Sequence, residues 1–135
     1  MKYLIIAVLA TSALGFSVQP SLKDSMERGK VVYSTYCLTC HQEDGKGVQR
    51  MHPPLTSTEF VRGDKKRLIG IVLNGLQGEI EVEGDMYNNL MAAQDFLTNE
   101  QIADVLTYVR NSFGNKYSLI TPAEVKTVRA SKKNK

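Results

Sequence analysis

The stretch YCLTCH, residues 36–41, holds the most chemically distinctive side chains of this sequence. It contains the only two cysteines, Cys37 and Cys40, and His41, one of only two histidines. Two thiols at this spacing can form a disulfide, act as a redox dithiol, supply half of a zinc site or attach to a haem. Each of these chemistries makes a different demand on the rest of the chain.

Zinc and thioredoxin-like chemistry are poorly supported. A structural zinc ion takes four ligands, but beyond the motif only His52 and carboxylates remain. A thioredoxin-like dithiol requires βαβ patterning, whereas the flanks of the motif are typical of helices. Cys-x-x-Cys-His is the spacing of c-type haem attachment, in which Cys37 and Cys40 form thioethers and His41 binds the iron. A disulfide or a redox dithiol remains the alternative.

The first residues, MKYLIIAVLATSALGF, are typical of an export signal. Lys2 precedes an apolar run too short to span a bilayer, and small residues between Ala13 and Ser17 offer cleavage sites. We expect residues 1–17 to be a signal peptide, with export to the periplasm and no stable membrane insertion after cleavage. An uncleaved membrane anchor is the alternative.

Apolar periodicity predicts three main helices and a short fourth one. Ser21, Asp64 and Thr98 are typical N-cap residues, and Gly75 and Gly114 are typical helix stops. The helices are expected over residues 21–37, 64–75, 98–114 and 121–128.

Two smaller features break this helical pattern. Gly29 lies inside the first predicted helix, where it costs stability and indicates close packing against another helix. Ile80 and Val82 alternate with polar residues, which predicts a short extended piece within a loop.

A helix before the motif, one in the middle and one near the end is the arrangement of the class I cytochromes c. From about residue 24 to residue 114 the chain resembles these single-haem proteins, in CLTCH, PPL, LIGIVLNGLQGEIEVEGDMYNNLM and QIADVLTYVRNSFGN. The longer blocks are similar to small cytochromes that accompany periplasmic quinoprotein dehydrogenases and copper nitrite reductases.

This resemblance implies an all-α, class I cytochrome c fold. Three main helices would pack around one covalent haem c, and a short C-terminal helix would follow. The cytochrome c domain would cover residues 18–114, and residues 115–135 would form a basic C-terminal extension.

The resemblance also implies a methionine as second axial iron ligand, on a loop before the last main helix. Met91 lies in the matching place. Relatives usually have proline after this methionine, where this chain has Ala92, so we expect a looser loop. Met51, Met86 and His52 are weaker candidates, which we expect to be packing or surface residues.

Other site residues follow from the same resemblance. The carbonyl of Pro53 would accept a hydrogen bond from His41, although Pro53 could instead only stiffen a turn. Leu55, Leu68, Leu73 and Tyr108 are expected to line or support the haem pocket, with generic core packing as the alternative. Arg62, Tyr87 and Tyr36 are candidates to contact a haem propionate, with a solvated surface position as the alternative.

The expected function is electron transfer without catalysis. With His41 and Met91 as axial ligands, the iron has no open position and can only exchange an electron. The sequence has no Ser-His-Asp pattern, phosphate loop or nucleic-acid motif. The implied partners are redox proteins: a periplasmic dehydrogenase, a nitrite reductase or a terminal oxidase. A peroxidase-like haem enzyme, whose sixth ligand can leave, is the alternative.

Charge is distributed unevenly along the sequence. The net charge is +3 overall, but residues 16–114 carry −3 and the segment after Gly114 carries +5. Such a basic tail is typical of a disordered, solubilising extension. Steering toward an acidic partner or an anionic membrane surface is the alternative.

Overall fold

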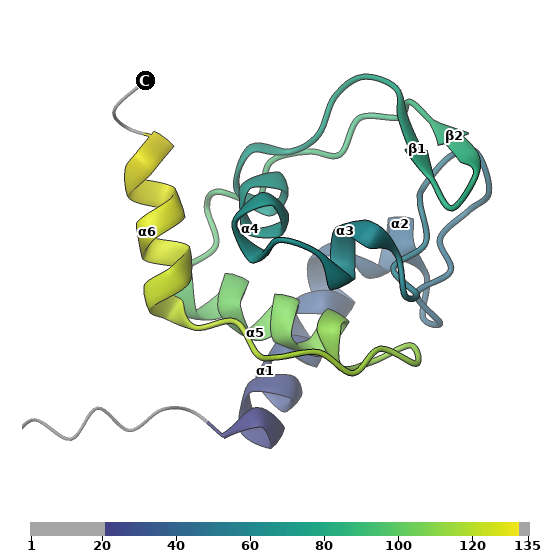
Figure 1. Ribbon diagram of the computed structural model, residues 1–135. Coiled ribbons are helices and arrows are strands. Elements are labelled where there is room, and N and C mark those ends of the chain that lie inside the picture. The colour runs from purple at the N-terminus through teal and green to yellow at the C-terminus, as the bar shows by residue number, and fades with distance from the viewer. Residues whose placement is uncertain (1–20, 133–135) are drawn as a thin grey trace, which may run out of the picture.

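The structure, a computed structural model, describes residues 21–132. The expected signal peptide, residues 1–17, lies outside this range. The described chain is largely helical, as predicted, with one small hairpin (Figure 1). Its elements are α1 (Leu22–Tyr36), α2 (Leu38–His41), α3 (Glu59–Arg62), α4 (Lys65–Asn74), β1 (Ile80–Val82), β2 (Asp85–Tyr87), α5 (Asn99–Arg110) and α6 (Pro122–Lys132).

The N-terminal ends of the three main helices are capped by the residues predicted to do so. The Ser21 side chain accepts from the Asp24 N–H of α1, and the Asp64 side chain accepts from the second residue of α4. At the start of α5, Thr98 and Gln101 form a reciprocal capping box. Each cap satisfies backbone N–H groups that have no partner inside the helix.

Helices α1 and α5 form the central pair of the fold. They contact each other directly at Gly29, where an added Cβ would collide with the Asp104 carbonyl and the Tyr108 side chain. Next to this contact, Arg28 on α1 donates to Asp104 on α5 through Nε at 2.6 Å and through Nη2 at 2.9 Å. The close packing predicted at Gly29 is therefore confirmed.

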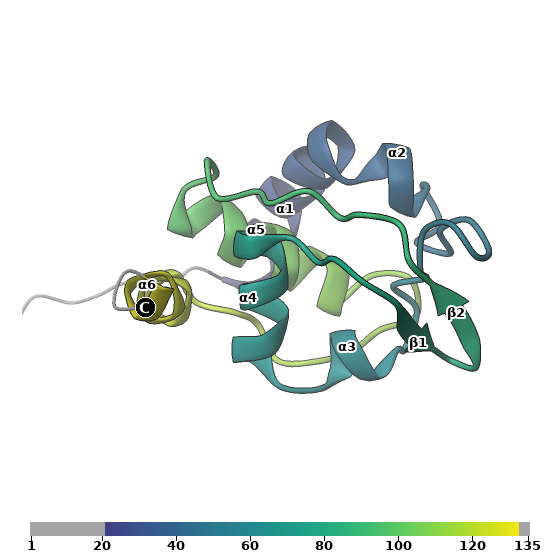
Figure 2. The ribbon, with the colours of Figure 1, turned by 90° about the horizontal axis from the view of Figure 1, so that it is seen from above.

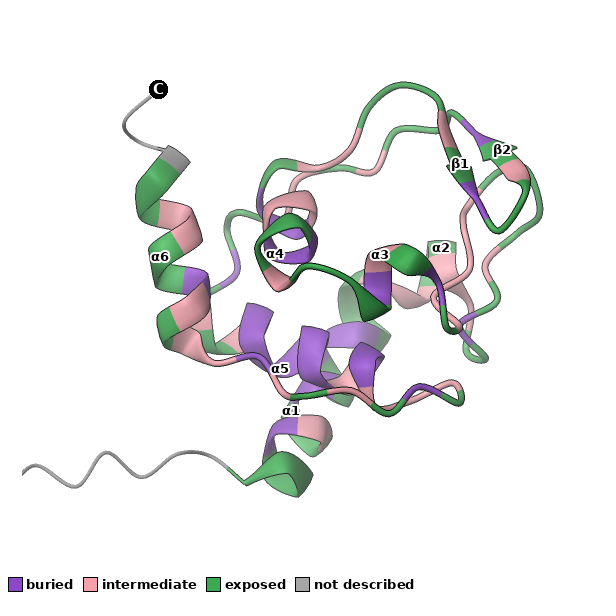
Figure 3. Cartoon of the chain, in the orientation of Figure 1, coloured by how far each residue is buried: buried purple, intermediate pink, exposed green. Residues whose placement is uncertain are grey.

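Helix α5 lies at the centre of the core, with buried residues around most of its circumference (Figure 3). Ile102, Val105 and Leu106 are all at most 3% exposed. Its burial follows from its position, because α1, α3, α4 and α6 all contact it. A helix packed on several sides in this way is held rigidly in place.

The hairpin and α6 lie at opposite ends of the molecule in both views (Figures 1 and 2). Strands β1 and β2 pair antiparallel, with Ile80 opposite Tyr87 and Val82 opposite Asp85. The extended piece predicted at Ile80 and Val82 is thus confirmed, but its partner strand was not predicted.

The prediction that the third helix continues to Gly114 is wrong, because α5 ends at Arg110. Asn111 leaves the helical conformation at φ −130°, ψ 15°, and its side-chain amide donates to the Thr107 carbonyl oxygen. Gly114 does turn the chain, at φ 83°, but it does so beyond the helix end.

The prediction that the basic tail is disordered is also wrong for the part that the structure describes. Val125 on α6 is 0% exposed, and Ile120 before it is 1% exposed. Both belong to the same apolar core as α4 and α5. The positive charges that suggested a solvated tail lie on a helix whose other face is buried.

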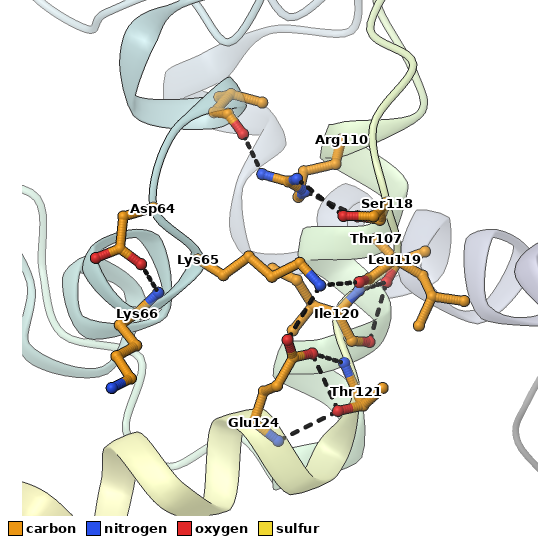
Figure 4. Close-up of polar contacts among 11 residues, drawn as sticks. Asp64, Lys65, Lys66, Thr107, Arg110, Ser118, Leu119, Ile120, Thr121 and Glu124 are labelled. Carbon is orange, nitrogen blue, oxygen red and sulfur yellow. Dashed lines mark hydrogen bonds and ion pairs between the residues drawn. The ribbon is translucent and has the colours of Figure 1, made fainter.

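Polar contacts anchor the chain just before α6 (Figure 4). Thr107 of α5 accepts from the Ile120 N–H at 3.0 Å. Lys65 donates to the Leu119 carbonyl oxygen at 2.7 Å and to Glu124 at 3.0 Å. Arg110 donates to the Ser118 carbonyl oxygen at 2.9 Å. The segment leading into α6 is therefore bound along its length to α4 and α5.

Candidate haem-binding site

The Cys-x-x-Cys-His motif spans the junction between α1 and α2. Cys37 ends α1, with its N–H donating to the Tyr33 carbonyl oxygen at 2.9 Å, and it also caps α2. The single turn of α2 follows, with the His41 N–H donating to the Cys37 carbonyl oxygen at 2.9 Å. Residues three and four apart are neighbours on a helix, so this turn brings Cys37, Cys40 and His41 together. Both thiols are free in the described structure.

The motif opens into an apolar pocket. Cys37 and His41 line it from the motif, and Met91 lines it from the segment between β2 and α5. A second hollow shares these three residues and also includes Cys40, Met51 and Leu90, which are all exposed; we call it the outer hollow. The remaining walls are almost entirely apolar; they include Leu55, Val61, Leu68, Val72, Leu76, Leu97, Val105, Leu106 and Val109.

The ring of His41 is oriented by the carbonyl of Pro53, 3.0 Å from Nδ1. Because a carbonyl oxygen can only accept, Nδ1 carries the proton and Nε2 is left with a lone pair. The pKa of His41 is lowered, mainly because the ring is buried. The hydrogen bond to Pro53 raises this pKa, and the charge of nearby His52 lowers it further. The site therefore favours a neutral imidazole, which is the form that binds metals.

The Met91 backbone is fixed against Leu76, which lies two residues after the end of α4. Met91 and Leu76 exchange both of their backbone hydrogen bonds, each at 2.9 Å. Gly75 makes this approach possible, since it has φ 73° and an added Cβ would collide with the Met91 carbonyl oxygen. The sequence N-G at the end of α4 thus both ends the helix and leaves room for the Met91 segment.

The structure separates the predicted site residues into two groups. Leu55, Leu68 and Pro53 line the apolar pocket. Leu73 is 1% exposed but belongs to the core without lining the pocket. The Tyr108 ring packs at a tilt against Tyr33 and edge-on against Phe113.

The weaker candidates lie farther out. Met86 is 47% exposed on β2 and lines neither hollow. Met51 and His52 line only the outer hollow, together with the propionate candidates Tyr36 and Tyr87. Arg62, on α3, lines neither hollow.

Sequence reasoning missed Tyr33, which supports the site from α1. It is 1% exposed, lines the pocket and donates from its hydroxyl to the Gln42 carbonyl oxygen at 2.6 Å. Burial raises the pKa of this hydroxyl, so it stays protonated as a donor. Its position on the apolar face of α1, four residues before Cys37, was the available signal.

The donor set and the walls fit a covalently bound haem. The two thiols can form thioethers, the imidazole and the thioether sulfur are ligands suited to haem iron, and the apolar walls suit the macrocycle. No buried side-chain nitrogen or oxygen within residues 21–132 lacks a hydrogen-bond partner, so the pocket does not call for a polar ligand.

Comparison with known proteins agrees with this geometry. Residues 26–113 match the family model described as Cytochrome c. The chain is 36% identical over 113 residues to cytochrome c-552 of Thermus thermophilus, which covers 77% of this chain and 86% of that protein.

Two dehydrogenase subunits are also similar. Identity is 32% to the cytochrome c subunit of alcohol dehydrogenase (quinone) from Gluconacetobacter polyoxogenes and 33% to the fructose dehydrogenase cytochrome subunit from Gluconobacter japonicus. These alignments cover 75% and 78% of this chain, but only 22% of each subunit.

The chain therefore belongs to the cytochrome c family. Its cofactor is covalently bound haem c, for which Cys37 and Cys40 have the family spacing, and its activity is haem-based electron transfer. Between residues 21 and 132, none of the helices has the length and apolar character needed to cross a membrane.

Proposed function

We propose that this chain is a periplasmic carrier of single electrons with one haem c. Cys37 and Cys40 hold the haem through thioethers, and His41 and Met91 are the two axial ligands of its iron. The observation that carries the proposal is that His41 and Met91, far apart in the sequence, line the same apolar pocket.

The bound haem supplies a one-electron iron couple, and the protein tunes it. The Pro53 carbonyl holds the His41 ring in one orientation and one tautomer. The thioether of Met91 favours the reduced iron and raises the potential. Walls of valine and leucine exclude water, which limits reorganisation when the charge of the site changes.

Electrons would enter and leave through the outer hollow. Cys40 is exposed there, and Tyr36 and Leu90 line the same opening. Redox encounters use small, short-lived interfaces, so a local opening of this kind is sufficient for a partner to approach the cofactor.

The proposed electron donor is a dehydrogenase. Two relatives are named as cytochrome subunits of alcohol and fructose dehydrogenases, which supports this class of partner. A nitrite reductase as acceptor rests only on the resemblance of the sequence blocks, and a terminal oxidase is proposed only as an acceptor that suits a periplasmic electron carrier. The periplasmic location rests on the export signal expected over residues 1–17.

Carbon monoxide binding distinguishes this carrier from a peroxidase-like enzyme. The wild-type holo-protein, reduced at neutral pH, should bind carbon monoxide poorly, because Met91 occupies the sixth position. Met91→Ala, as a positive control, should bind it readily. If the wild-type protein binds carbon monoxide as readily as Met91→Ala, the iron has a displaceable sixth ligand and the carrier function is wrong.

A further inference from the structure

Arg129 on α6 is bonded to the backbone that leads from Met91 into α5. Its Nη1 donates to the Asp95 carbonyl oxygen at 2.7 Å, and its Nη2 donates to the Leu97 carbonyl oxygen at 2.6 Å. Its Nε donates to Oδ1 of Asn99, the first residue of α5, at 2.8 Å. Since a guanidinium is planar and always charged, these three bonds fix α6 to this backbone in one geometry.

The bonded segment is part of the pocket wall. Leu97 is 3% exposed and lines the pocket together with Met91 and Gln94. Upstream, the Met91 backbone pairs with Leu76, and the Gln94 N–H donates to a carbonyl oxygen of α4 at 2.8 Å. Arg129 supplies the restraint at the downstream end, so the segment is held at its start, its middle and its end.

The restraint from Arg129 matters more in this chain because the residue after Met91 is alanine. Ala92 is exposed and, unlike proline, does not fix its own φ. The stiffness of the segment must therefore come from contacts with other elements, and the Arg129 bonds are the contacts made from α6.

Helix α6 is itself held against the rest of the fold, so the backbone that carries Arg129 is fixed in position. Glu124 accepts from Lys65 of α4 at 3.0 Å and from the Thr121 N–H at 2.7 Å (Figure 4). One turn before Arg129, Val125 is fully buried against the core. Movement of the Met91 segment away from the pocket would have to break the Arg129 bonds or pull α6 from the core.

We propose that Arg129 is a positioning residue for the sixth iron ligand. By tying α6 to residues 95–99, it holds the Met91 backbone at the pocket and limits dissociation of the thioether from the iron. This inference rests on the proposed function, because it takes Met91 as the ligand. It gives the C-terminal extension a role in the redox site from the side of the fold opposite the hairpin.

The test compares Arg129→Ala with Lys126→Ala in the holo-protein. Lys126 is exposed on the same helix and makes no hydrogen bond or ion pair within residues 21–132, so it controls for the lost charge. Arg129→Ala should speed amide hydrogen exchange across residues 91–97 by about tenfold or more and leave α1 unchanged. Carbon monoxide should bind reduced Arg129→Ala about tenfold faster than it binds the reduced wild-type protein, because the sixth ligand leaves the iron more often.

Arg129→Lys provides a second variant that keeps the charge and the aliphatic stem. Since an ammonium cannot reproduce the planar fork, it should change both readouts in the same direction but by less. If both Arg129 variants match Lys126→Ala in exchange and in carbon monoxide binding, the positioning role is wrong. If the oxidised wild-type protein lacks the iron–methionine absorption band, the ligand assignment itself fails, and the proposed function fails with it.

Discussion

Gly29 is the residue on which the packing of α1 against α5 depends most directly. A Cβ at this position would overlap the Asp104 carbonyl, and a backbone group cannot move aside as the end of a flexible side chain can. The same contact places the Asp104 carboxylate where Ser25 and Arg28 both donate to it. Because Cys37 ends α1, this crossing sets the position of the haem attachment motif over the pocket.

Gly29→Ala should therefore lower the free energy of unfolding of the holo-protein by about 2 kcal/mol, in the range typical of overpacking. Chemical denaturation followed by helical circular dichroism measures this change. Gly70→Ala in α4 is the matched control: its nearest neighbour to an added Cβ would be the Asn74 side chain at 3.9 Å. There we expect no loss, and a gain of up to about 1 kcal/mol from helix propensity. Equal behaviour of the two variants would contradict the close crossing.

Among single residues, the sequence predicted those site residues that are neighbours along the chain. Cys37, Cys40 and His41 are consecutive in one helical turn, and their spacing is sufficient to identify the motif. Arg129 carried no such signal, because its three acceptors lie more than 29 residues away and two of them are backbone carbonyl oxygens. A carbonyl acceptor has no side-chain identity, so no residue pattern reveals it.

Among the elements, α6 shows how charge can mislead. The tail holds six of the basic residues of the chain, and that composition is typical of a solvated segment. Val125 and Val128, however, lie three residues apart, which places them on one face of a helix. The predicted helix start at Thr121 was correct, and the burial of this face was the part that composition could not show.

Truncation after Tyr117 should destabilise the holo-protein strongly. It removes Ile120 and Val125, which are 1% and 0% exposed, and each buried aliphatic side chain contributes about 1.5–3 kcal/mol. We expect a loss of at least about 3 kcal/mol, measured as the free energy of unfolding. Truncation after Lys132, which removes none of the contacts described above, is the control. A Tyr117 truncation as stable as this control would show that α6 does not belong to the core.

Glu124 predicts a pH dependence for the docking of α6. Partial burial raises the pKa of its carboxyl, but hydrogen bonds from Thr121 and Lys65 outweigh burial and bring the pKa below its ordinary value of 4.5. A carboxyl whose pKa is lowered by folding stabilises the folded state above its unfolded pKa. This stabilisation is lost as the pH falls through the folded pKa.

Glu124→Gln should thus be less stable than the wild-type protein at neutral pH, and the difference should shrink below about pH 4.5. Thermal unfolding at several pH values measures it. Glu79→Gln is the control, because Glu79 is exposed and makes no hydrogen bond or ion pair within residues 21–132. A difference for Glu124→Gln that does not change with pH would contradict the ionised contact with Lys65.

Over the whole molecule, the fold acts as a frame that brings two distant parts of the chain to one pocket. Helices α1 and α2 carry the Cys-x-x-Cys-His motif, and α4 ends beside Met91. Side chains of α5 line the pocket between them. The order of helices around the motif was sufficient to predict this class of fold. The second strand, the exact end of α5 and the anchoring of α6 depend on contacts between distant segments, and helix periodicity does not encode them.

The central claim is that Met91 is the sixth ligand of the haem iron. The most direct measurement is the weak red absorption band of iron–methionine ligation in the oxidised holo-protein, recorded for the wild type, Met91→Ala and Met86→Ala. Met86 is a matched control, because it lies on the surface of β2 outside both hollows. We predict that the band is present in the wild type and in Met86→Ala and absent in Met91→Ala, which should also have a lower reduction potential. A band that survives in Met91→Ala would contradict the assignment.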